Sequence, residues 1–471
     1  MKELDKSIEI GWDLLEKSVM TCNGKPIGTI AACSGETESL NYDHCFTRDF
    51  AVSAIAFLLR GETEIVRNFL LATLKLQTHE RQLNCFKPGE GLMPASFKVV
   101  QHEGKDALEA DFGERAIARV TPIDSGFWWL ILLRAYAKVT GDWDFTHRSD
   151  IQTGIQLLLD LCLIARFDMF PTMLVPDGSF MIDRRMGVYG YPLDIQVLFV
   201  MALQSAKEVL SPDETNALYI DAVQQRLSHL TFHLRQYYWL DLPELNRIYR
   251  YKPEEFGDEA INQFNIYPDT IPLWLEGWLH ENGGYFVGNL GPARMDFRWF
   301  AQGNLLSVFS GLADEIQQLA ILNQLEHQWD DLVSAMPIKA CFPALDGRDW
   351  QVITGSDPKN KAWSYHNGGS WPFLVWAIAA AAIKAKRPEM GHKAVEIAAS
   401  RLKKDGWPEY YDGKTGRLVG KEARKRQTWT IAGLLAAYEL LTHPEKLDML
   451  SFPEPTILPC MIEGASAPLV I

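Results

Sequence analysis

The chain has 471 residues, of which 47% are hydrophobic and 11% aromatic, and this is enough to bury a large core. Its net charge of −14, with no basic stripe, argues against a nucleic-acid ligand and favours a neutral substrate over an anionic one. Seven scattered cysteines without CxxC spacing, no apolar leader and no membrane-length apolar run predict a cytoplasmic protein with reduced thiols and no membrane span.

Apolar residues recur with the helical period along almost the whole chain, and Gly, Pro and Ser-Pro-Asp signals separate the segments. Twelve long helices are predicted, in chain order, at about residues 5–20, 48–60, 63–78, 125–142, 149–168, 191–210, 213–239, 298–314, 315–335, 371–387, 390–405 and 427–444. They come as pairs joined by short turns, and the last helix can pair with the first.

Six helix pairs without a Ser-, Gly- or Pro-rich linker predict an all-α fold, a closed (α/α)6 barrel forming a single domain over residues 1–471. An open α-solenoid also stacks helix pairs, but its repeats have a regular period, which the unequal loops here lack. For the tail at 452–471 the alternatives are packing on a neighbouring subunit, packing on its own barrel, or disorder.

The loops that precede the first helix of each pair are rich in charge, glycine and aromatics, whereas the turns inside the pairs are bland. These rich loops are residues 41–49, 119–129, 183–192, 291–299, 363–371 and 424–429. If the first helices form an inner ring, the rich loops converge at one end of it. A concave pocket lined with aromatics and carboxylates is therefore predicted there.

Hydrolysis of a glycosidic bond needs two carboxyl groups, one as acid and one as base or nucleophile. The candidates in and near these loops are Asp43, Asp49, Asp124, Asp183, Asp296 and Glu409. Each has an alternative interpretation: Asp124 is suited to a helix N-cap, and Asp49 to an ion pair with Arg48. Asp183 precedes two arginines, whose charges would lower its pKa, so an acid role requires both to point away.

Glu409 lies among one tryptophan, one proline and two tyrosines, an unusual setting for an exposed acidic turn, and this favours a functional role. His366, in Tyr-His-Asn-Gly-Gly, could bind a sugar hydroxyl or be an ordinary loop hydrogen bonder. The chain has no HExxH, P-loop or GxSxG element and no histidine pair with ligand spacing, so neither a metal nor a cofactor is predicted.

Five segments together give a specific resemblance: Asn-Tyr-Asp with Arg48-Asp49-Phe50, Gly91 to Val99, Asp183 to Gly190, Trp407 to Asp412, and Gln427 to Gly433. In order and content they resemble the neutral/alkaline invertases, glycoside hydrolase family 100, of the cyanobacterial type. The resemblance implies an (α/α)6 barrel that hydrolyses sucrose to glucose and fructose, with inversion at the glucosyl anomeric carbon and without metal or cofactor. It also implies a homo-oligomer.

The same resemblance implies Asp183 as the general acid and Glu409 as the general base. Pocket walls are implied to include Arg48, Asp49, Asp124, Trp128, Tyr365, His366, Arg424 and Gln427. Two positions depart from many plant members, which carry His and Glu where this chain has Tyr191 and Asp194. Both lie close to the acid in sequence, where they could alter its pKa or hydration.

Three other functions remain open from the sequence. A glucosidase acting on longer α-glucans would accept maltose or isomaltose. A sugar epimerase would depend on histidine acid–base chemistry, and so on His366 more than on Glu409. A non-catalytic sensor would bind sucrose without turning it over, which the presence of both carboxyls disfavours.

Overall fold

The computed structural model describes residues 2–32, 41–79, 89–115, 119–163, 171–254, 261–262, 264–291, 294–419 and 424–458. The predicted tail beyond residue 458 and the last residues of the predicted helix at 149–168 lie outside these ranges.

Each of the twelve predicted helices overlaps an observed helix. The observed ones are α1 (Lys2–Lys17), α2 (Thr47–Arg60), α3 (Glu64–Lys75), α4 (Asp124–Thr140), α6 (Ser149–Cys162), α7 (Leu193–Val209), α8 (Ala217–Tyr237), α11 (Ala301–Phe309), α12 (Glu315–His327), α15 (Val375–Lys384), α16 (Pro388–Asp405) and α17 (Thr428–Thr442).

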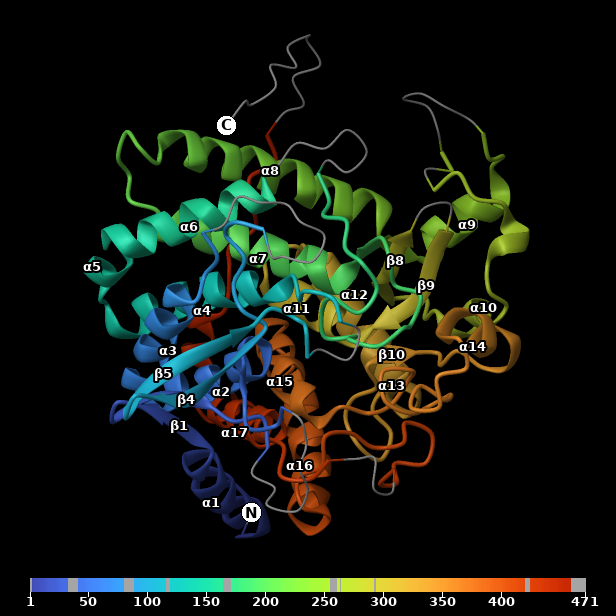
Figure 1. Ribbon diagram of the computed structural model, residues 1–471. Helices are drawn as coiled ribbons and strands as arrows, with labels where there is room; N and C mark the ends of the chain where they lie inside the picture. The colour runs from blue at the N-terminus through green and yellow to red at the C-terminus, as the bar shows by residue number, and fades with distance from the viewer. Residues whose placement is uncertain are drawn as a thin grey trace.

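Six of these helices pack side by side in a closed cycle, in the order α2, α4, α7, α11, α15 and α17, with α17 returning to α2. Their pair partners lie outside, for example α8 against α7 and α16 against α15. Figure 1 shows α8 lying across the outer side of the molecule at the top of the view, and α1 and α16 at the bottom. A helix that is apolar all round must be buried, and α4 is buried continuously from Asp124 to Ala137.

The prediction of an all-α fold class is nevertheless wrong, because the described residues also form strands. These are β1 (Val19–Cys22), β2 (Lys25–Thr29), β3 (Cys45–Phe46), β4 (Ser96–His102), β5 (Lys105–Asp111), β6 (Tyr191–Pro192), β7 (Trp239–Asp241), β8 (Gly284–Gly291), β9 (Arg294–Phe300) and β10 (Cys341–Phe342). They make three antiparallel sheets: β1–β2, β3–β4–β5, and β10–β9–β8–β6 with β7 also paired to β8.

The physical reason for the error is clearest in the β8–β9 hairpin. Its strands are rich in aromatic residues, which favour a pleated surface, and Trp299 of β9 pairs across the strands with the β-branched Val287 of β8. Residues 298–300 were assigned to a helix, but they complete β9, and α11 starts only at Ala301.

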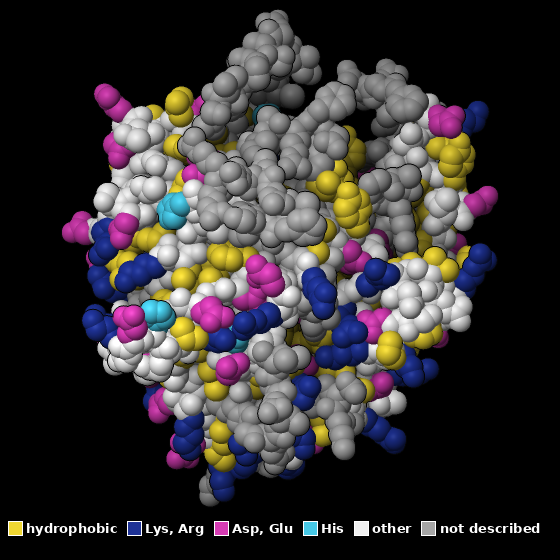
Figure 2. Space-filling view, viewed as in Figure 1, with side chains coloured by type: hydrophobic (Ala, Val, Ile, Leu, Met, Phe, Trp, Pro, Cys, Tyr) yellow, Lys and Arg dark blue, Asp and Glu magenta, His cyan; other side chains and the backbone are white. Residues whose placement is uncertain are grey.

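Short elements fill the remaining connections. They are the helices α5 (Trp143–Thr146), α9 (Leu242–Arg250), α10 (Trp274–Trp278), α13 (Trp329–Leu332) and α14 (Gly347–Thr354), and the 3-10 turns η1 (Pro268–Thr270), η2 (Pro372–Leu374) and η4 (Pro444–Met449). Within the described ranges, no helix combines the length and apolar character needed to cross a membrane. On the face shown in Figure 2, basic side chains are interspersed with acidic ones.

Candidate active site

A cavity of about 330 Å³ lies where the loops that precede several of the ring helices meet. Its lining comes from far apart in the sequence and includes eight of the predicted site residues: Arg48, Asp49, Asp183, Tyr365, His366, Glu409, Arg424 and Gln427. Two segments far apart in the sequence are joined beside the cavity, because the Thr428 N–H donates to the Ala31 carbonyl at 2.9 Å.

The loop that carries Asp183 is shaped by a second carboxylate, Asp177. This side chain accepts hydrogen bonds from the backbone N–H groups of Met186 and Gly187, at 3.1 and 3.0 Å. Gly187 has a φ of 67°, which glycine adopts without steric cost, and it allows the loop to turn back at this point. The turn presents Asp183 to the cavity, whose lining includes it.

The two arginines after Asp183 do not neutralise it by direct pairing. The Arg184 guanidinium binds both carboxylate oxygens of Asp357, with Nε–Oδ2 at 2.6 Å and Nη2–Oδ1 at 2.8 Å. Arg185 is exposed. An acid role for Asp183 requires that the two arginines point away from it. Arg184 meets this requirement, because its guanidinium is paired with the carboxylate of Asp357.

Asp183 has two neighbours from the loop before α15. The Tyr365 hydroxyl donates to Asp183 Oδ1 at 3.3 Å, and His366 Nδ1 lies 3.5 Å from the same oxygen. Burial raises the pKa of Asp183 above its ordinary value, although the charges of Arg48 and Lys359 oppose the shift. A raised pKa suits a carboxyl that must donate a proton near neutral pH.

Glu409 reaches the cavity from a strained turn before α17. Its backbone N–H donates to the Arg424 carbonyl at 2.7 Å, and Trp407, two residues earlier, has a φ of 57°. Glu409 is only 7% exposed, and its Oε2 has no hydrogen-bond partner among the described residues. Burial raises the pKa of Glu409 to about 7; the charge of Asp183 adds to the shift, and Lys359 and Arg424 oppose it.

Asp124 is fully buried behind the cavity and does not line it. Its carboxylate holds Arg48 through Nε–Oδ2 and Nη2–Oδ1 contacts of 2.5 and 3.0 Å. Asp124 is thus the partner of Arg48. It was predicted to be part of the pocket wall, but it contacts the lining residue Arg48 from behind and does not itself line the cavity. Asp49 lines the cavity itself, and burial raises the pKa of Asp49 to about 7.

Aromatic side chains close the cavity, but Trp128 is not one of them, since it is buried within α4. Trp371 is one of the aromatic residues that line the cavity. Its ring stacks on that of His366, with centroids 4.8 Å apart and an interplanar angle of 23°. Burial lowers the pKa of His366 well below its ordinary value, so the ring is neutral at pH 7. Neither of its ring nitrogens has a hydrogen-bond partner among the described residues.

Tyr42 and Lys359 are two of the lining residues that the predicted site left out. Tyr42 stands in a loop that the sequence singled out, and its aromatic ring among charged residues was the available signal. Lys359 lies in a polar segment without aromatics, and nothing in its local sequence marked it.

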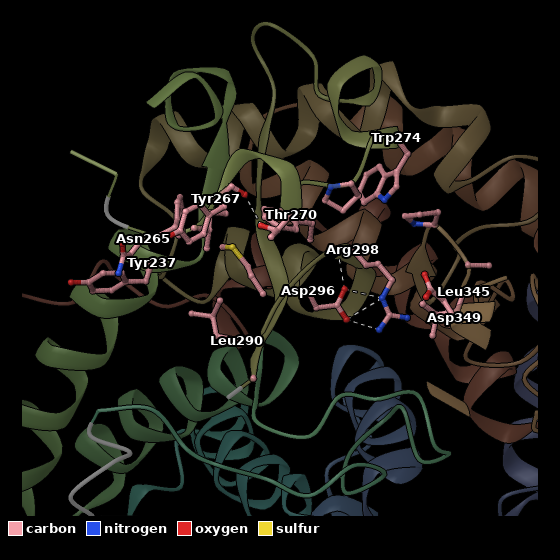
Figure 3. A pocket seen from close by; sticks show the side chains of 18 of the residues that line it. Tyr237, Asn265, Tyr267, Thr270, Trp274, Leu290, Asp296, Arg298, Leu345 and Asp349 are labelled. Carbon is pink, nitrogen blue, oxygen red and sulfur yellow. Dashed lines mark hydrogen bonds and ion pairs between the residues drawn. The ribbon is translucent and has the colours of Figure 1, made fainter. Parts of the chain in front are cut away.

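Two other candidate carboxylates, Asp43 and Asp296, lie elsewhere. Asp43 is exposed. Asp296 lines a separate cavity of about 820 Å³, where Figure 3 shows it pointing at Arg298. The Arg298 Nη2 also donates to the Met186 carbonyl at 3.3 Å, so this ion pair supports the loop of Asp183 from outside the site.

Neither departure from the plant members lines the candidate active site. Tyr191 belongs to β6, and its carbonyl accepts a hydrogen bond from the Tyr238 hydroxyl. Asp194 is buried in α7, where Oδ1 accepts the Gly303 N–H of α11 at 2.7 Å. Asp194 therefore joins two ring helices.

The cavity thus offers two shielded carboxyls that can exchange protons, together with polar groups that lack partners and can bind hydroxyls. Gln427 Nε2 and Trp429 Nε1 are further donors without a partner in the described part of the chain. Over the same residues, no cluster of three His, Cys, Asp or Glu side chains could hold a metal ion.

A family model described as alkaline and neutral invertase matches residues 11–444 of the chain. The chain belongs to this family. Alkaline/neutral invertase C, mitochondrial, from Arabidopsis thaliana is 55% identical over 94% of the chain and 68% of the relative. Cytosolic invertase 1 from Oryza sativa subsp. japonica is 54% identical over 94% of the chain and 79% of the relative. The family resemblance seen in the sequence is confirmed.

Solved glycosidases share the fold at low sequence identity. A structure titled Glycosidase Wild Type has a TM-score of 0.56 at 12% identity, covering 95% of this chain and 98% of that one. A mannosylglycerate hydrolase from Thermus thermophilus, solved with glucose, has a TM-score of 0.55 at 11% identity and covers 91% and 98%. With the family match, these likenesses make this invertase-family chain a glycoside hydrolase, as predicted.

Proposed function

We propose that the protein is a neutral/alkaline invertase that hydrolyses sucrose to glucose and fructose, with inversion at the glucosyl anomeric carbon. The observation that carries the proposal is the meeting of Asp183 and Glu409 on one enclosed cavity, in a chain whose relatives are named invertases. Glu409 is buried and Asp183 half-buried, and the loss of solvent raises the pKa of each.

In the proposed reaction, Asp183 protonates the bridging oxygen as the bond from this oxygen to the glucosyl anomeric carbon breaks, and fructose leaves. Glu409 takes a proton from a water molecule on the opposite face of the sugar, and the water oxygen bonds to the anomeric carbon. The water supplies one proton to Glu409 and its hydroxyl to glucose, so the first product is β-glucose.

The surrounding groups fit proposed roles in binding the sugar. Arg48, Asp49, Tyr365, His366, Arg424 and Gln427 line the cavity, and Trp371 adds an aromatic face. Because His366 is neutral at pH 7, it can accept or donate a hydrogen bond to a hydroxyl without adding charge. Asp124 acts through Arg48.

Proton NMR of the anomeric signals during the first minutes with fresh sucrose tests the proposal. The expected result is early β-glucose, which mutarotates later. Early α-glucose would contradict inversion or place cleavage on the fructosyl side. Asp183→Asn and Glu409→Gln keep the shape of the site but remove proton transfer, so each should lower kcat by roughly 10²–10⁴.

The alternatives make different demands on the same cavity. An epimerase would use His366 as a base, and the strongly lowered pKa of His366 makes it a poor one. An α-glucan glucosidase would release glucose from maltose. A sensor would bind sucrose and leave it intact, an outcome that the NMR experiment detects directly.

We further propose a cytoplasmic location, with sucrose, glucose and fructose as the only partners required for activity. The described cysteines Cys22, Cys45, Cys162 and Cys341 are free thiols, which suits a reducing compartment. The relatives' names include cytosolic, mitochondrial and chloroplastic forms, so immunolocalisation in the source cell is the direct test.

A further inference from the structure

Lys359 lines the candidate active site, although neither its segment nor its neighbours in sequence suggested a function. Its ammonium lies over aromatic faces: Nζ is 3.9 Å from the centroid of the Tyr365 ring and 6.0 Å from that of Tyr410. Such contacts hold a cation without neutralising it. Tyr365 is also the residue whose hydroxyl donates to Asp183.

The segment that carries Lys359 is fastened to the loop of Asp183. Asp357 accepts the bidentate hydrogen bonds of Arg184, and its Oδ1 also accepts the Lys359 backbone N–H at 3.1 Å. The Asn360 side-chain amide donates to the Arg185 carbonyl at 3.3 Å. These bonds fix residues 357–360 against residues 184–185, so Lys359 and Asp183 are held in one rigid unit.

Two of the other nearby cations are paired with carboxylates. Arg48 is paired with Asp124, and Arg184 with Asp357. Lys359 forms no salt bridge with a carboxylate of the described residues, although Asp49, Asp183 and Glu409 line the same cavity. An ammonium in a cavity lined by several carboxyls stabilises whichever of them is ionised.

We propose that Lys359 is a positioning residue that keeps Glu409 ionised as the base. The inference rests on the proposed function, because it assigns Lys359 a part in the same reaction. The lining of the same cavity also holds other titratable or charged side chains, namely Tyr42, Arg48, Asp49, Asp111, Asp183, Tyr365, His366 and Arg424.

The electrostatics of the site support this role. Among the charges that act on Glu409, that of Lys359 contributes the largest lowering of its pKa, against the larger effect of burial. Lys359 acts in the same direction on Asp183, after Arg48. Removing the ammonium should therefore raise the pKa of Glu409. As the pH is lowered, Glu409 would then be protonated, and lost as a base, at a higher pH than in the wild type.

The test is the pH profile of kcat/KM for sucrose in the wild type and in Lys359→Met and Lys359→Arg. The acidic limb should move to higher pH in Lys359→Met, so that at pH 6 its kcat/KM, relative to its own maximum, falls at least about threefold below that of the wild type. In Lys359→Arg the acidic limb should lie close to its position in the wild type, because arginine restores the positive charge. Lys361→Met removes an exposed lysine two residues away and should leave the profile unchanged.

A loss of activity that is equal at every pH, or a change in KM alone, would overturn the proposal and leave Lys359 a purely structural or binding residue. Circular dichroism and the thermal midpoint identify a variant that has not folded, and Lys359→Gln then replaces Lys359→Met. A wild type that does not hydrolyse sucrose would refute the proposed function. In that case, the carboxyl titration of Glu409, followed by ¹³C NMR with and without Lys359, still decides whether the lysine controls its ionisation.

Discussion

Glu409 is shielded from solvent yet faces a cavity lined by three other carboxyls, those of Asp49, Asp111 and Asp183, and we expect this setting to control when it can act as a base. Its pKa of about 7 is raised mainly by burial and further by the charge of Asp183. A base works only when it is ionised, so its contribution is present above this pKa and is lost as the pH falls through it. Asp183, as the acid, has the opposite requirement.

We therefore expect kcat/KM for sucrose to fall as the pH is lowered through about 7, where Glu409 takes up a proton, and to fall also as the pH rises through the pKa of Asp183, where the acid loses its proton. The measurement is a pH–rate profile at sucrose concentrations well below KM, which reports the free enzyme. Because the two carboxyls interact, the limbs belong to the pair rather than to single residues. An acidic limb near the ordinary pKa of glutamate, about 4.3, would contradict the role of burial.

The sequence pointed to both proposed catalytic carboxyls through the family resemblance. The residue types of the turns alone favoured a role for Glu409 and left that of Asp183 open. The sequence could not assign the parts of Asp124 and Lys359 at the site. Asp124 looked like a pocket residue or a helix cap, but it is the buried partner of Arg48, a contact across 76 positions in the chain. Lys359 reaches the cavity only because Asp357 and Arg184 meet, and no local pattern records such a contact.

At the scale of elements, the close packing of α17 on η2 explains a glycine in the segment from Gln427 to Gly433. A Cβ built on Gly433 would lie 2.3 Å from the Phe373 carbonyl oxygen and 2.7 Å from its Cα. These are backbone atoms of η2 and cannot move without displacing the turn before α15. The helix of the ring that follows Glu409 is thereby seated directly against the loop of Tyr365.

Gly433→Ala should destabilise the protein by about 1–3 kcal/mol, the usual cost of overpacking, although alanine has the higher helix propensity. The control is Gly277→Ala in α10, where a new Cβ meets no heavy atom within 4 Å and the change should be neutral or slightly stabilising. Urea unfolding of the two variants measures the difference. If both variants had the same free energy of unfolding, the backbone of η2 would have to move to make room for the new Cβ at little cost, and the account would be wrong.

Helix positions were predictable because a buried helix repeats its apolar residues over many turns. The strands were not, since most are short, and three of them, β3, β6 and β9, lie wholly or mostly in loops whose aromatics we interpreted as site chemistry. The loop before α11 shows the consequence. Its aromatics and charges build β9 and the Asp296–Arg298 pair, so one of the six rich loops supports the site from outside and supplies no lining residue.

At the scale of the whole molecule, the C-terminal segment is fastened to the ring by one buried arginine. Arg134 of α4 donates from Nη1 and Nη2 to the carbonyls of Met449 and Ser451, both at 3.1 Å. Its Nε lies 2.8 Å from Glu208 of α7, and its guanidinium lies 4.0 Å from the Phe452 ring centroid. A single side chain thus joins two ring helices to the segment that closes the chain.

Arg134→Met should lower the free energy of unfolding by roughly 3 kcal/mol or more, since hydrogen bonds from a charged donor are each worth about 1.5–3 kcal/mol. The kcat/KM of the folded variant should be unchanged, because Arg134 does not line the cavity. Lys138→Met is the control: it removes a more exposed pair with Asp448 from the same helix and should cost less than about 1 kcal/mol. Reduced activity without reduced stability would contradict this account.

The remaining predictions at this scale are the single domain over residues 1–471 and the homo-oligomer. Sedimentation velocity and limited proteolysis test them together: a single domain should resist internal cleavage, and an oligomer should sediment faster than a chain of 53.4 kDa. The tail at 452–471, for which packing on a neighbour, packing on its own barrel and disorder are the alternatives, is described only up to residue 458. There Phe452 is buried and the Leu458 N–H donates to the Ser228 hydroxyl oxygen at 2.7 Å, so the described part packs on its own chain.

The lining of the catalytic cavity extends from Ala31 to Trp429, and the backbone of Thr428 is bonded to that of Ala31. During synthesis, the first wall of the site leaves the ribosome hundreds of residues before the last. A nascent chain that stops before residue 409 carries Asp183 but lacks Glu409, and one that stops short of α17 lacks Trp429 of the lining and the bond from Thr428 to Ala31. We therefore expect truncated messenger RNAs, or translation that stops before α17, to give products without hydrolytic activity. Only chains translated through α17 should be active.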